Sequence, residues 1–146
     1  MKIDEYLNNK INRPLAFMPM CLDPMHHGHI NIIREAKKYG NVIIGLMTDK
    51  AMLSYKRKPK IPFEGRLEVA NELKSVTYVL PIEGINYSEI ASRYEFEFFL
   101  HGDDWKTNIQ AESRKDLIKV MKKWGGVVID IPYTKGISST EIISES

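Results

Sequence analysis

The sequence has little cysteine and no long apolar run. One cysteine, Cys21, among 146 residues excludes an internal disulfide and suits a reducing compartment, so we expect a cytoplasmic protein. The first residues, MKIDEYLNNKINRP, are polar and lack the apolar core of a secretory signal. No hydrophobic run approaches the length of a membrane span, and we find no repeat or low-complexity tract.

Net charge is also small. The 21 Lys and Arg residues against 19 Asp and Glu residues give a formal charge of +2, too little to favour general nucleic-acid binding. Any attraction for phosphate must therefore be local, and we expect neither a nucleic acid nor a membrane as partner. The length predicts one domain over residues 1–146, in which residues 1–13 form an N-terminal extension.

Short apolar runs alternate with amphipathic segments along the chain. The apolar runs predict five strands, at Leu15–Met20, Val42–Met47, Val76–Leu80, Phe96–Leu100 and Val127–Ile131. The amphipathic segments predict helices at His29–Tyr39, Phe63–Leu73, Tyr87–Arg93 and Ala111–Trp124, with a short one ending near Ile143. Because the runs are rich in Ile and Val and do not alternate, they indicate strands buried on both faces. The expected fold is a doubly wound α/β fold with a five-stranded parallel sheet.

Three of the four histidines fall between the first predicted strand and the first helix, in Asp23-Pro24-Met25-His26-His27-Gly28-His29. A helix that opens there aims free backbone N–H groups, the positive end of its dipole and two imidazoles at one point. This arrangement favours an anion with developing charge. A metal site and a solvated histidine cluster are the alternatives, although the only further zinc ligands that the sequence offers are Cys21, the distant His101 and scattered acids.

Two further polar segments follow later strands. The usual reversal of strand order places a ligand crevice at the carboxyl ends of the first and fourth strands. The fourth strand leads into His101-Gly102-Asp103-Asp104-Trp105. After the fifth strand, the hydroxyls and N–H groups of the segment ending in Ser138, Ser139 and Thr140 form a second phosphate cradle or simply cap the last helix. Together these segments predict an enzyme that handles nucleotides.

The same segments resemble signatures of the cytidylyltransferase branch of the HxGH nucleotidyltransferases. The resemblance covers residues 14–143, and it implies a Rossmann-like nucleotidyltransferase fold and a homodimer. The histidine motif is shared with adenylyltransferases and class I aminoacyl-tRNA synthetases, whereas the other two narrow the resemblance to the cytidylyl branch, which includes glycerol-3-phosphate, phosphocholine and phosphoethanolamine cytidylyltransferases. Segments 55–59 and 132–136 are most similar to domains that accompany phosphoenolpyruvate mutase in phosphonate biosynthesis. The three signatures are His26-His27-Gly28-His29, Gly102-Asp103-Asp104-Trp105 and Gly136-Ile137-Ser138-Ser139-Thr140.

The resemblance implies a role for each matched residue. The expected catalytic residues are His26 and His29 at the α-phosphate, Lys56 at the phosphates, with Arg57 or Lys58 as substitutes, and Arg66 at the start of the next helix. Asp23 would support the same site or approach a metal, and no other protein ligand to a metal is expected. Asp103, Asp104 and Trp105 would border cytidine, while Ser138, Ser139 and Thr140 would bind the leaving phosphates. The remaining expected nucleotide-binding residues are Cys21, Leu22, Gly28, His101, Gly102, Tyr133, Thr134, Lys135, Gly136 and Ile137.

The expected reaction is direct attack of an anionic acceptor on CTP, with release of pyrophosphate and with Mg²⁺ screening the phosphates. In such a displacement the protein aligns the acceptor with the leaving group and neutralises charge on the phosphates, and no nucleophilic side chain is needed. The acceptor implied is a small organophosphonate or phosphate monoester. Glycerol 3-phosphate as the specific acceptor, an ATP-dependent adenylyltransferase and an inactive nucleotide-binding module are the alternatives.

Two departures from the family pattern bear on this prediction. The chain has Met20-Cys21-Leu22-Asp23 where many relatives have Gly-Thr-Phe-Asp, so methionine replaces a glycine along the expected phosphate path. It also has Tyr133-Thr134-Lys135-Gly136 where relatives have Arg-Thr-Glu-Gly. In this second change an arginine is lost at position 133 and a lysine is gained at position 135, so the positive charge is moved and not removed.

Overall fold

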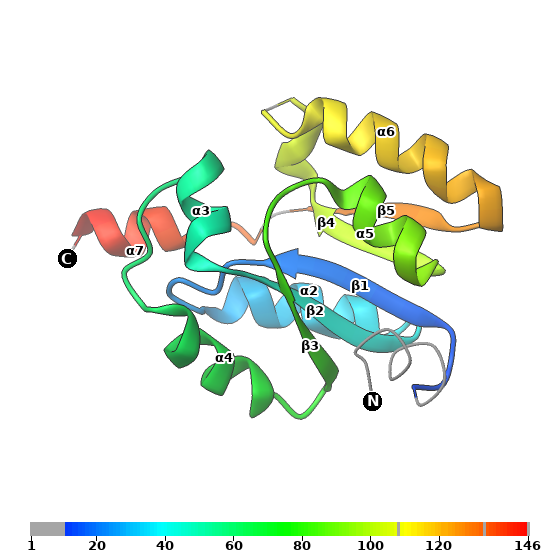
Figure 1. Cartoon of the computed structure of the whole chain (residues 1–146). Coiled ribbons are helices and arrows are strands. Elements are labelled where there is room, and N and C mark those ends of the chain that lie inside the picture. Colours follow the sequence, from blue (N-terminus) through cyan, green and yellow to red (C-terminus); the bar gives the residue numbers. More distant parts are fainter. Residues whose placement is uncertain (1–10, 108, 133, 146) are drawn as a thin grey trace.

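The computed structural model describes residues 11–107, 109–132 and 134–145. Its centre is a parallel five-stranded sheet flanked by helices (Figure 1), as the sequence predicts. The strand order is β3-β2-β1-β4-β5. The strands are β1 (Leu15–Met20), β2 (Asn41–Met47), β3 (Val76–Ile82), β4 (Phe98–Gly102) and β5 (Val127–Ile131). The helices are α2 (His27–Lys37), α3 (Asp49–Tyr55), α4 (Phe63–Asn71), α5 (Tyr87–Tyr94), α6 (Ala111–Met121) and α7 (Ser139–Glu145), with 3-10 turns η1 (Asp103–Lys106) and η2 (Lys122–Trp124).

Strand β1 lies at the point where the strand order reverses. It pairs with β2 from Leu15 to Met20 and with β4 at Ala16 and Phe17. In a parallel sheet the helices leave neighbouring strands in opposite directions at such a point, and a crevice opens at the carboxyl ends of those strands. The first and fourth strands are therefore neighbours at the reversal of strand order, where the sequence predicts the crevice.

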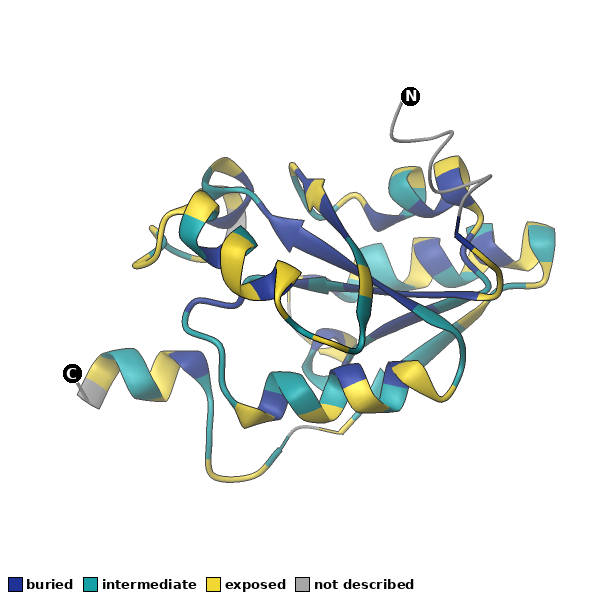
Figure 2. Ribbon diagram, turned by 90° about the horizontal axis from the view of Figure 1, so that it is seen from below, coloured by how far each residue is buried: buried dark blue, intermediate teal, exposed yellow. Residues whose placement is uncertain are grey.

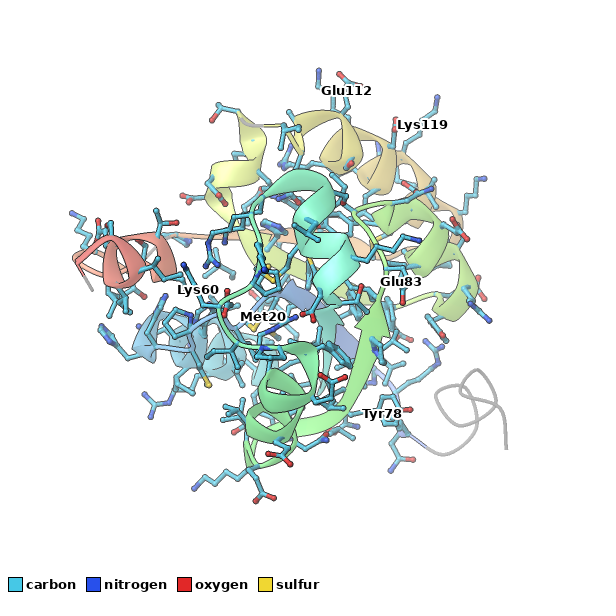
Figure 3. The ribbon with its side chains drawn as sticks, turned by 60° about the vertical axis from the view of Figure 1, so that its left-hand side comes forward. Met20, Lys60, Tyr78, Glu83, Glu112 and Lys119 are labelled. Atoms are coloured by element: carbon cyan, nitrogen blue, oxygen red, sulfur yellow. The ribbon has the colours of Figure 1, made fainter. Side chains whose placement is uncertain are left out.

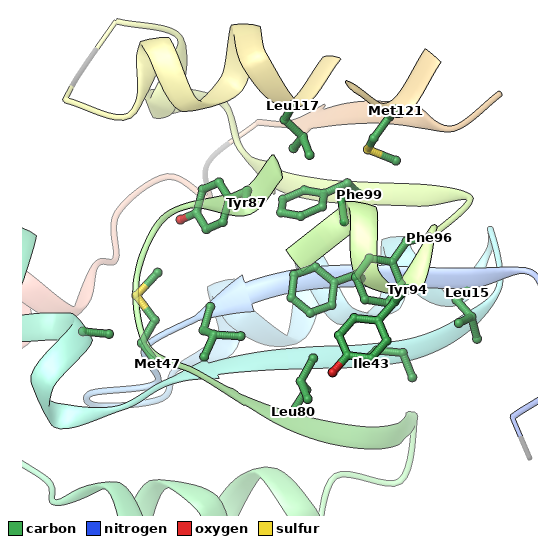
Figure 4. Packing of buried hydrophobic residues seen from close by; sticks show 14 of the residues in the cluster. Leu15, Ile43, Met47, Leu80, Tyr87, Tyr94, Phe96, Phe99, Leu117 and Met121 are labelled. Atoms are coloured by element: carbon green, nitrogen blue, oxygen red, sulfur yellow. The ribbon is translucent and has the colours of Figure 1, made fainter. Parts of the chain in front are cut away.

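Alternate residues of each strand face opposite sides of the sheet, and both sides are covered. Phe17 and Phe99 face α3, α5 and α6, and Phe17 stacks on Phe96 with ring centroids 4.4 Å apart. Figure 4 shows Phe96 and Phe99 in this packed layer. Ala16 and Met18 face the opposite layer, formed by α2 and α4. In Figure 2 the strands are accordingly mostly buried, whereas the helices carry exposed residues on their outer sides. Burial on both faces explains why the strand sequences do not alternate.

Several element boundaries differ from the sequence predictions. Helix α3 occupies a segment expected to be a loop, and it is stabilised by Thr48, whose Oγ1 accepts the Ala51 N–H at 3.2 Å. Helix α2 begins two residues early because His26 caps it. Strand β4 begins two residues late, since Phe96 is buried in the core without joining the sheet ladder.

The segment before β1 lies against the body of the fold. Ile11 is buried in the core, and the Arg13 guanidinium donates to the Glu97 carboxylate at 2.8 and 2.9 Å and to the Tyr94 carbonyl at 2.7 Å. The rest of the expected extension, residues 1–10, lies outside the described residues. None of the helices in the described ranges is both long and apolar enough to cross a membrane.

Candidate active site

A cavity of about 350 Å³ opens at the carboxyl ends of β1 and β4. Figure 3 looks onto this end of the sheet, with Met20 of β1 near its centre. Segments far apart in the sequence form its wall: the end of β1, the start of α2, the end of α3, the end of β4, the segment before α6 and the tail before α7. The predicted site residues in this wall are Cys21, His26, Gly28, His29, Lys56, His101, Gly102, Asp104, Thr134, Ile137, Ser138, Ser139 and Thr140.

Two of the histidines form a reciprocal cap at the start of α2. The Gly28 N–H donates to Nδ1 of His26 at 3.0 Å, and the His26 N–H donates to Nδ1 of His29 at 3.1 Å. Both neutral rings therefore carry their proton on Nε2. Two of the backbone N–H groups at this helix start, those of His26 and Gly28, are thus bonded to imidazoles and are not free for the expected anion. The ring Nε2–H groups are the donors that the cap leaves for a ligand.

The cap requires glycine at position 28. A Cβ atom there would lie 2.7 Å from Cε1 of His26. The His26 ring occupies the space that any other side chain would fill. The glycine of the motif thus allows the ring to lie across the helix start.

Both histidines are neutral near pH 7. Burial lowers the pKa of His29 to about 3, helped by repulsion from His26 and Lys56. Burial likewise lowers the pKa of His26, together with repulsion from His27 and Lys56. Their ring centroids are 4.0 Å apart, so two protonated rings would also repel each other. Without a ligand, the two rings therefore present neutral N–H donors, and Lys56 supplies the positive charge at this part of the wall.

Asp23 lies outside the cavity wall, in contrast to its expected place beside the phosphates or a metal. Its buried carboxylate accepts the backbone N–H groups of Lys60 and Ile61, at 2.9 and 2.7 Å, and a guanidinium N–H of Arg57. Burial opposes ionisation, yet the bonds from Lys60, Arg57 and Ile61 outweigh it and hold the pKa of Asp23 below its usual value. The structure therefore places Asp23 as the anchor of the loop after α3.

Arg66 is also outside the wall, although it was expected among the catalytic residues. Its guanidinium is 1% exposed and donates to the carbonyls of Cys21, Met47 and Ile61 at 2.7 to 2.8 Å. It also donates to the Asp49 carboxylate at 2.7 Å. With these donors engaged inside the protein, Arg66 joins the ends of β1 and β2 to α3 and the loop that follows it.

At the end of β4, His101 and Asp104 line the cavity, whereas Asp103 and Trp105 do not. Trp105 is fully buried, stacks on the His101 ring with centroids 4.1 Å apart and donates its indole N–H to Asp130. The His101 Nδ1 atom lies 2.8 Å from the Gly102 carbonyl, and burial lowers the pKa of His101. Trp105 therefore supports the cavity wall from behind instead of bordering a ligand.

The tail docks onto the histidine loop. The Ser139 hydroxyl donates to the Pro24 carbonyl at 2.7 Å, and the Asn31 amide donates to the Thr134 hydroxyl at 2.9 Å. The Ser138 hydroxyl accepts the Glu141 N–H at 3.1 Å, so Ser138 does cap α7 while also lining the cavity. Leu22, Lys135 and Gly136 are not part of the wall, and Tyr133 lies outside the described residues.

Sequence reasoning missed Gln110. This buried side chain lines the cavity, and its Oε1 accepts the Tyr87 hydroxyl at 2.6 Å. Its position depends on the packing of α5 against α6, for which no local sequence signal exists. The other wall residues that the sequence did not single out as binding residues are mostly apolar: Met18, Pro19, Met20, Ile32, Met47, Leu100 and Ile109.

A family profile described as cytidylyltransferase-like matches residues 18–145, a range that contains the histidine cap and all of this wall. The chain belongs to the cytidylyltransferase-like family. The glycerol-3-phosphate cytidylyltransferase of Bacillus spizizenii is 31% identical over 124 residues, covering 82% of this chain and 87% of that relative. The ethanolamine-phosphate cytidylyltransferase of Arabidopsis thaliana is 28% identical over 134 residues, covering 88% of this chain but 31% of the relative. The chain thus spans about a third of the length of such relatives.

Two solved structures share the fold of this chain. A lipopolysaccharide core biosynthesis protein from Thermoplasma volcanium superposes with a TM-score of 0.70 at 20% identity, covering 83% of this chain and 98% of that one. A pantoate-beta-alanine ligase from Francisella tularensis superposes with a TM-score of 0.68 at 14% identity, covering 96% and 69%. At these identities the likeness concerns the fold alone.

The structure shows what the two departures mean for this cytidylyltransferase-like chain. Met20 lies in the cavity wall, so the methionine narrows the space that a glycine would leave. Lys135 is exposed and outside the wall. In the structure as described, the relocated tail charge therefore does not contribute to the wall.

Proposed function

We propose that the chain transfers the cytidylyl group of CTP to a small phosphate or phosphonate monoester and releases pyrophosphate. The observation that carries the proposal is the cavity itself, which gathers the histidine cap, Lys56 and the hydroxyl-bearing tail at the reversal of strand order. Family membership supports it, since relatives are named as cytidylyltransferases of glycerol 3-phosphate and ethanolamine phosphate. The phosphonate alternative rests on the sequence resemblance of two short segments.

The chemistry follows from the groups in the wall. An oxygen of the acceptor attacks the α-phosphorus of CTP, the new P–O bond forms, and the bond to the β-phosphate oxygen breaks. The electron pair of the broken bond leaves with pyrophosphate. The Nε2–H groups of His26 and His29 donate to oxygens of the α-phosphate, and Lys56 neutralises charge on the triphosphate. Ser138 and Thr140 bind the departing phosphates, and the His101 to Asp104 end of the cavity borders the base.

Mg²⁺ enters the proposal as the ion that accompanies CTP. Within the described ranges, no group of three or more His, Cys, Asp or Glu side chains is arranged to hold a metal. Such a wall suits an ion held chiefly by phosphate oxygens, which is how Mg²⁺ often binds in nucleotide sites. When bound, Mg²⁺ would add charge neutralisation along the triphosphate.

Pyrophosphate release provides the test. The chain should be assayed with CTP, ATP, GTP and UTP, each combined with glycerol 3-phosphate, ethanolamine phosphate, phosphocholine, 2-aminoethylphosphonate and 2-hydroxyethylphosphonate. We expect release with CTP and at least one acceptor, and a product mass equal to CMP joined to that acceptor with loss of water. Equal rates with ATP would instead indicate a broader nucleotidyltransferase. Binding of CTP with no release in any combination would indicate an inactive nucleotide-binding module.

The homodimer implied by the sequence resemblance is part of the same proposal. Its measurement is the molar mass in solution by light scattering. The expected value is twice the chain mass of 16.9 kDa. A mass that stays at the monomer value over the concentrations used for the assay would remove the dimer from the proposal.

A further inference from the structure

We infer that Arg57 is a positioning residue, which fixes Lys56 against the histidine cap through its contact with Asp23. The inference rests on the proposed function, because it assigns Lys56 to the triphosphate. Lys56 ends α3, where its N–H donates to the Met52 carbonyl at 2.8 Å, and it is followed directly by Arg57. The side chains of these two neighbours point to different places. Lys56 lines the cavity, whereas Arg57 contacts the loop that precedes His26.

The contact between Arg57 and Asp23 is tight and two-sided. One guanidinium nitrogen of Arg57 donates to the Asp23 carboxylate, and the other donates to the Asp23 backbone carbonyl at 2.6 Å. The Asp23 side chain is fully enclosed, and the Arg57 side chain is 23% exposed. A charge-assisted pair in such surroundings restricts the relative position of the two side chains, because a planar guanidinium fixes the direction of its hydrogen bonds as well as their length.

The contact between Arg57 and Asp23 joins two chain segments that each carry a residue of the cavity wall. Asp23 stands three residues before His26, and Arg57 stands one residue after Lys56. Consecutive Cα atoms are 3.8 Å apart, so fixing Arg57 to Asp23 restricts where Lys56 lies relative to His26. Lys56 is in fact close enough for its charge to lower the pKa of both His26 and His29.

The far end of the same loop is anchored independently. Asp23 accepts the N–H groups of Lys60 and Ile61, and Arg66 donates to the Ile61 carbonyl at 2.8 Å. Without the Arg57 side chain, the loop would therefore stay attached at residues 60 and 61 while its first part, next to Lys56, is released. Substitution of Arg57 should accordingly disturb Lys56 without unfolding the chain.

A double-mutant cycle tests this coupling. The variants are Arg57→Gln, Lys56→Ala and the double variant, and the measurements are the dissociation constant for CTP in the presence of Mg²⁺ and kcat. We expect Arg57→Gln to weaken CTP binding about tenfold, within the range seen for residues that act in one network. In the Lys56→Ala background the same substitution should have little further effect. Arg57→Lys should recover part of the lost CTP affinity, because lysine keeps the positive charge but lacks the planar guanidinium that bonds to two oxygens of Asp23.

A matched control comes from the opposite end of the molecule. Arg13 pairs with Glu97 and with backbone carbonyls, as Arg57 pairs with Asp23, but it lies outside the cavity wall. Arg13→Gln should lower Tm and leave the dissociation constant for CTP unchanged. A change in CTP affinity in this control equal to that of Arg57→Gln would assign the effect to general stability and overturn the inference.

The remaining outcomes separate this inference from the proposed function. Additive effects of Arg57→Gln and Lys56→Ala in a chain that binds CTP would show that Arg57 acts on the triphosphate directly, which contradicts a positioning role while leaving the function intact. A wild-type chain that neither binds CTP nor releases pyrophosphate would overturn the proposed function, and the inference with it.

Discussion

At the scale of single residues, the central feature is a pair of histidines that cap their own helix and remain neutral. Each ring uses Nδ1 to accept a backbone N–H, which orients Nε2–H as the donor to a ligand. Donors held in place suit a displacement in which charge on phosphate oxygens changes, since they need no reorganisation as that charge develops. The sequence motif indicates the residue types, and the structure adds the tautomer.

The histidine pair leads to a prediction about turnover. His26→Ala or His29→Ala should lower kcat by about 10² to 10³, the usual loss on removing one donor to a transition-state oxygen. His27→Ala is the control, because His27 is exposed and outside the cavity wall. Steady-state kinetics at saturating CTP and acceptor provide the measurement. Near-full turnover in either cap variant would remove the catalytic role.

Gly28 gives a second prediction. Gly28→Ala places a Cβ atom where the His26 ring now lies, so the ring must swing away from its cap. We expect kcat to fall nearly as far as in His26→Ala while the chain stays folded. Gly84→Ala serves as the matched control, since nothing lies within 4 Å of a Cβ at that position. Circular dichroism checks the folding of both variants, and steady-state kinetics gives their kcat. Equal kcat in the two variants would show that turnover does not require the His26 ring to lie against Gly28.

At the scale of elements, the start of α2 makes stability depend on pH. Burial lowers the pKa of His26 and His101, and that of His29 to about 3. The usual value of 6.5 applies to the unfolded chain, so at His29 the unfolded chain binds more protons than the folded chain between about pH 6.5 and about pH 3. Acidification must then favour unfolding. The buried Asp23 and the partly buried Asp130 have lowered pKa values and add to the loss only nearer pH 4 and below.

The matching prediction concerns urea unfolding without CTP. The midpoint should be clearly lower at pH 5.5 than at pH 7.5, and the difference should shrink in His29→Asn, which keeps an acceptor for the His26 N–H but does not titrate. Val69→Ala, at an exposed position of α4, should keep the full difference between the two pH values. An equal difference in wild type and His29→Asn would mean that His29 is not protonated on unfolding.

The elements also show where sequence patterns are sufficient. The five apolar runs locate the strands, because a central strand has few ways to bury Ile and Val on both faces except inside a sheet. Helix α3 was missed because seven residues carry a weak periodic signal, and it is tertiary packing of Ala51 and Met52 that stabilises it. The early start of α2 depends on a histidine acting as a cap, which general capping preferences do not favour.

At the scale of the whole molecule, the cavity wall joins segments more than a hundred residues apart. The bonds from Ser139 to Pro24 and from Asn31 to Thr134 hold the tail on the histidine loop. A ligand that touches both segments should therefore stabilise the fold as a unit. Since binding to the folded state alone stabilises it by mass action, the effect is measurable without turnover.

This gives a prediction for base selectivity. CTP with Mg²⁺ at one hundred times its dissociation constant should stabilise the chain by about 2.7 kcal/mol, which corresponds to several degrees in Tm. ATP at the same concentration should shift Tm less, because polar groups that fit one base are left unpaired by another. Thermal unfolding with each nucleotide provides the comparison. Shifts of equal size would contradict a cytidylyl preference.

The sequence alone determined the sheet, its crevice and the residue types that meet there. These follow from short-range rules: apolar runs make buried strands, parallel strands need crossovers, and the strand ends on either side of the order reversal share one edge. It also indicated most of the wall, from the histidines to Ser138, Ser139 and Thr140, because each polar segment directly follows a strand or precedes a helix.

Only the tertiary structure decided which of the polar residues face the cavity. Asp23, Arg66 and Trp105 match the family pattern, yet their polar atoms are engaged by groups brought from elsewhere in the chain. Gln110 reaches the wall because α5 and α6 pack together and Tyr87 binds its carbonyl. The direction in which a side chain donates depends on partners that are distant in sequence, and the local sequence pattern does not identify those partners.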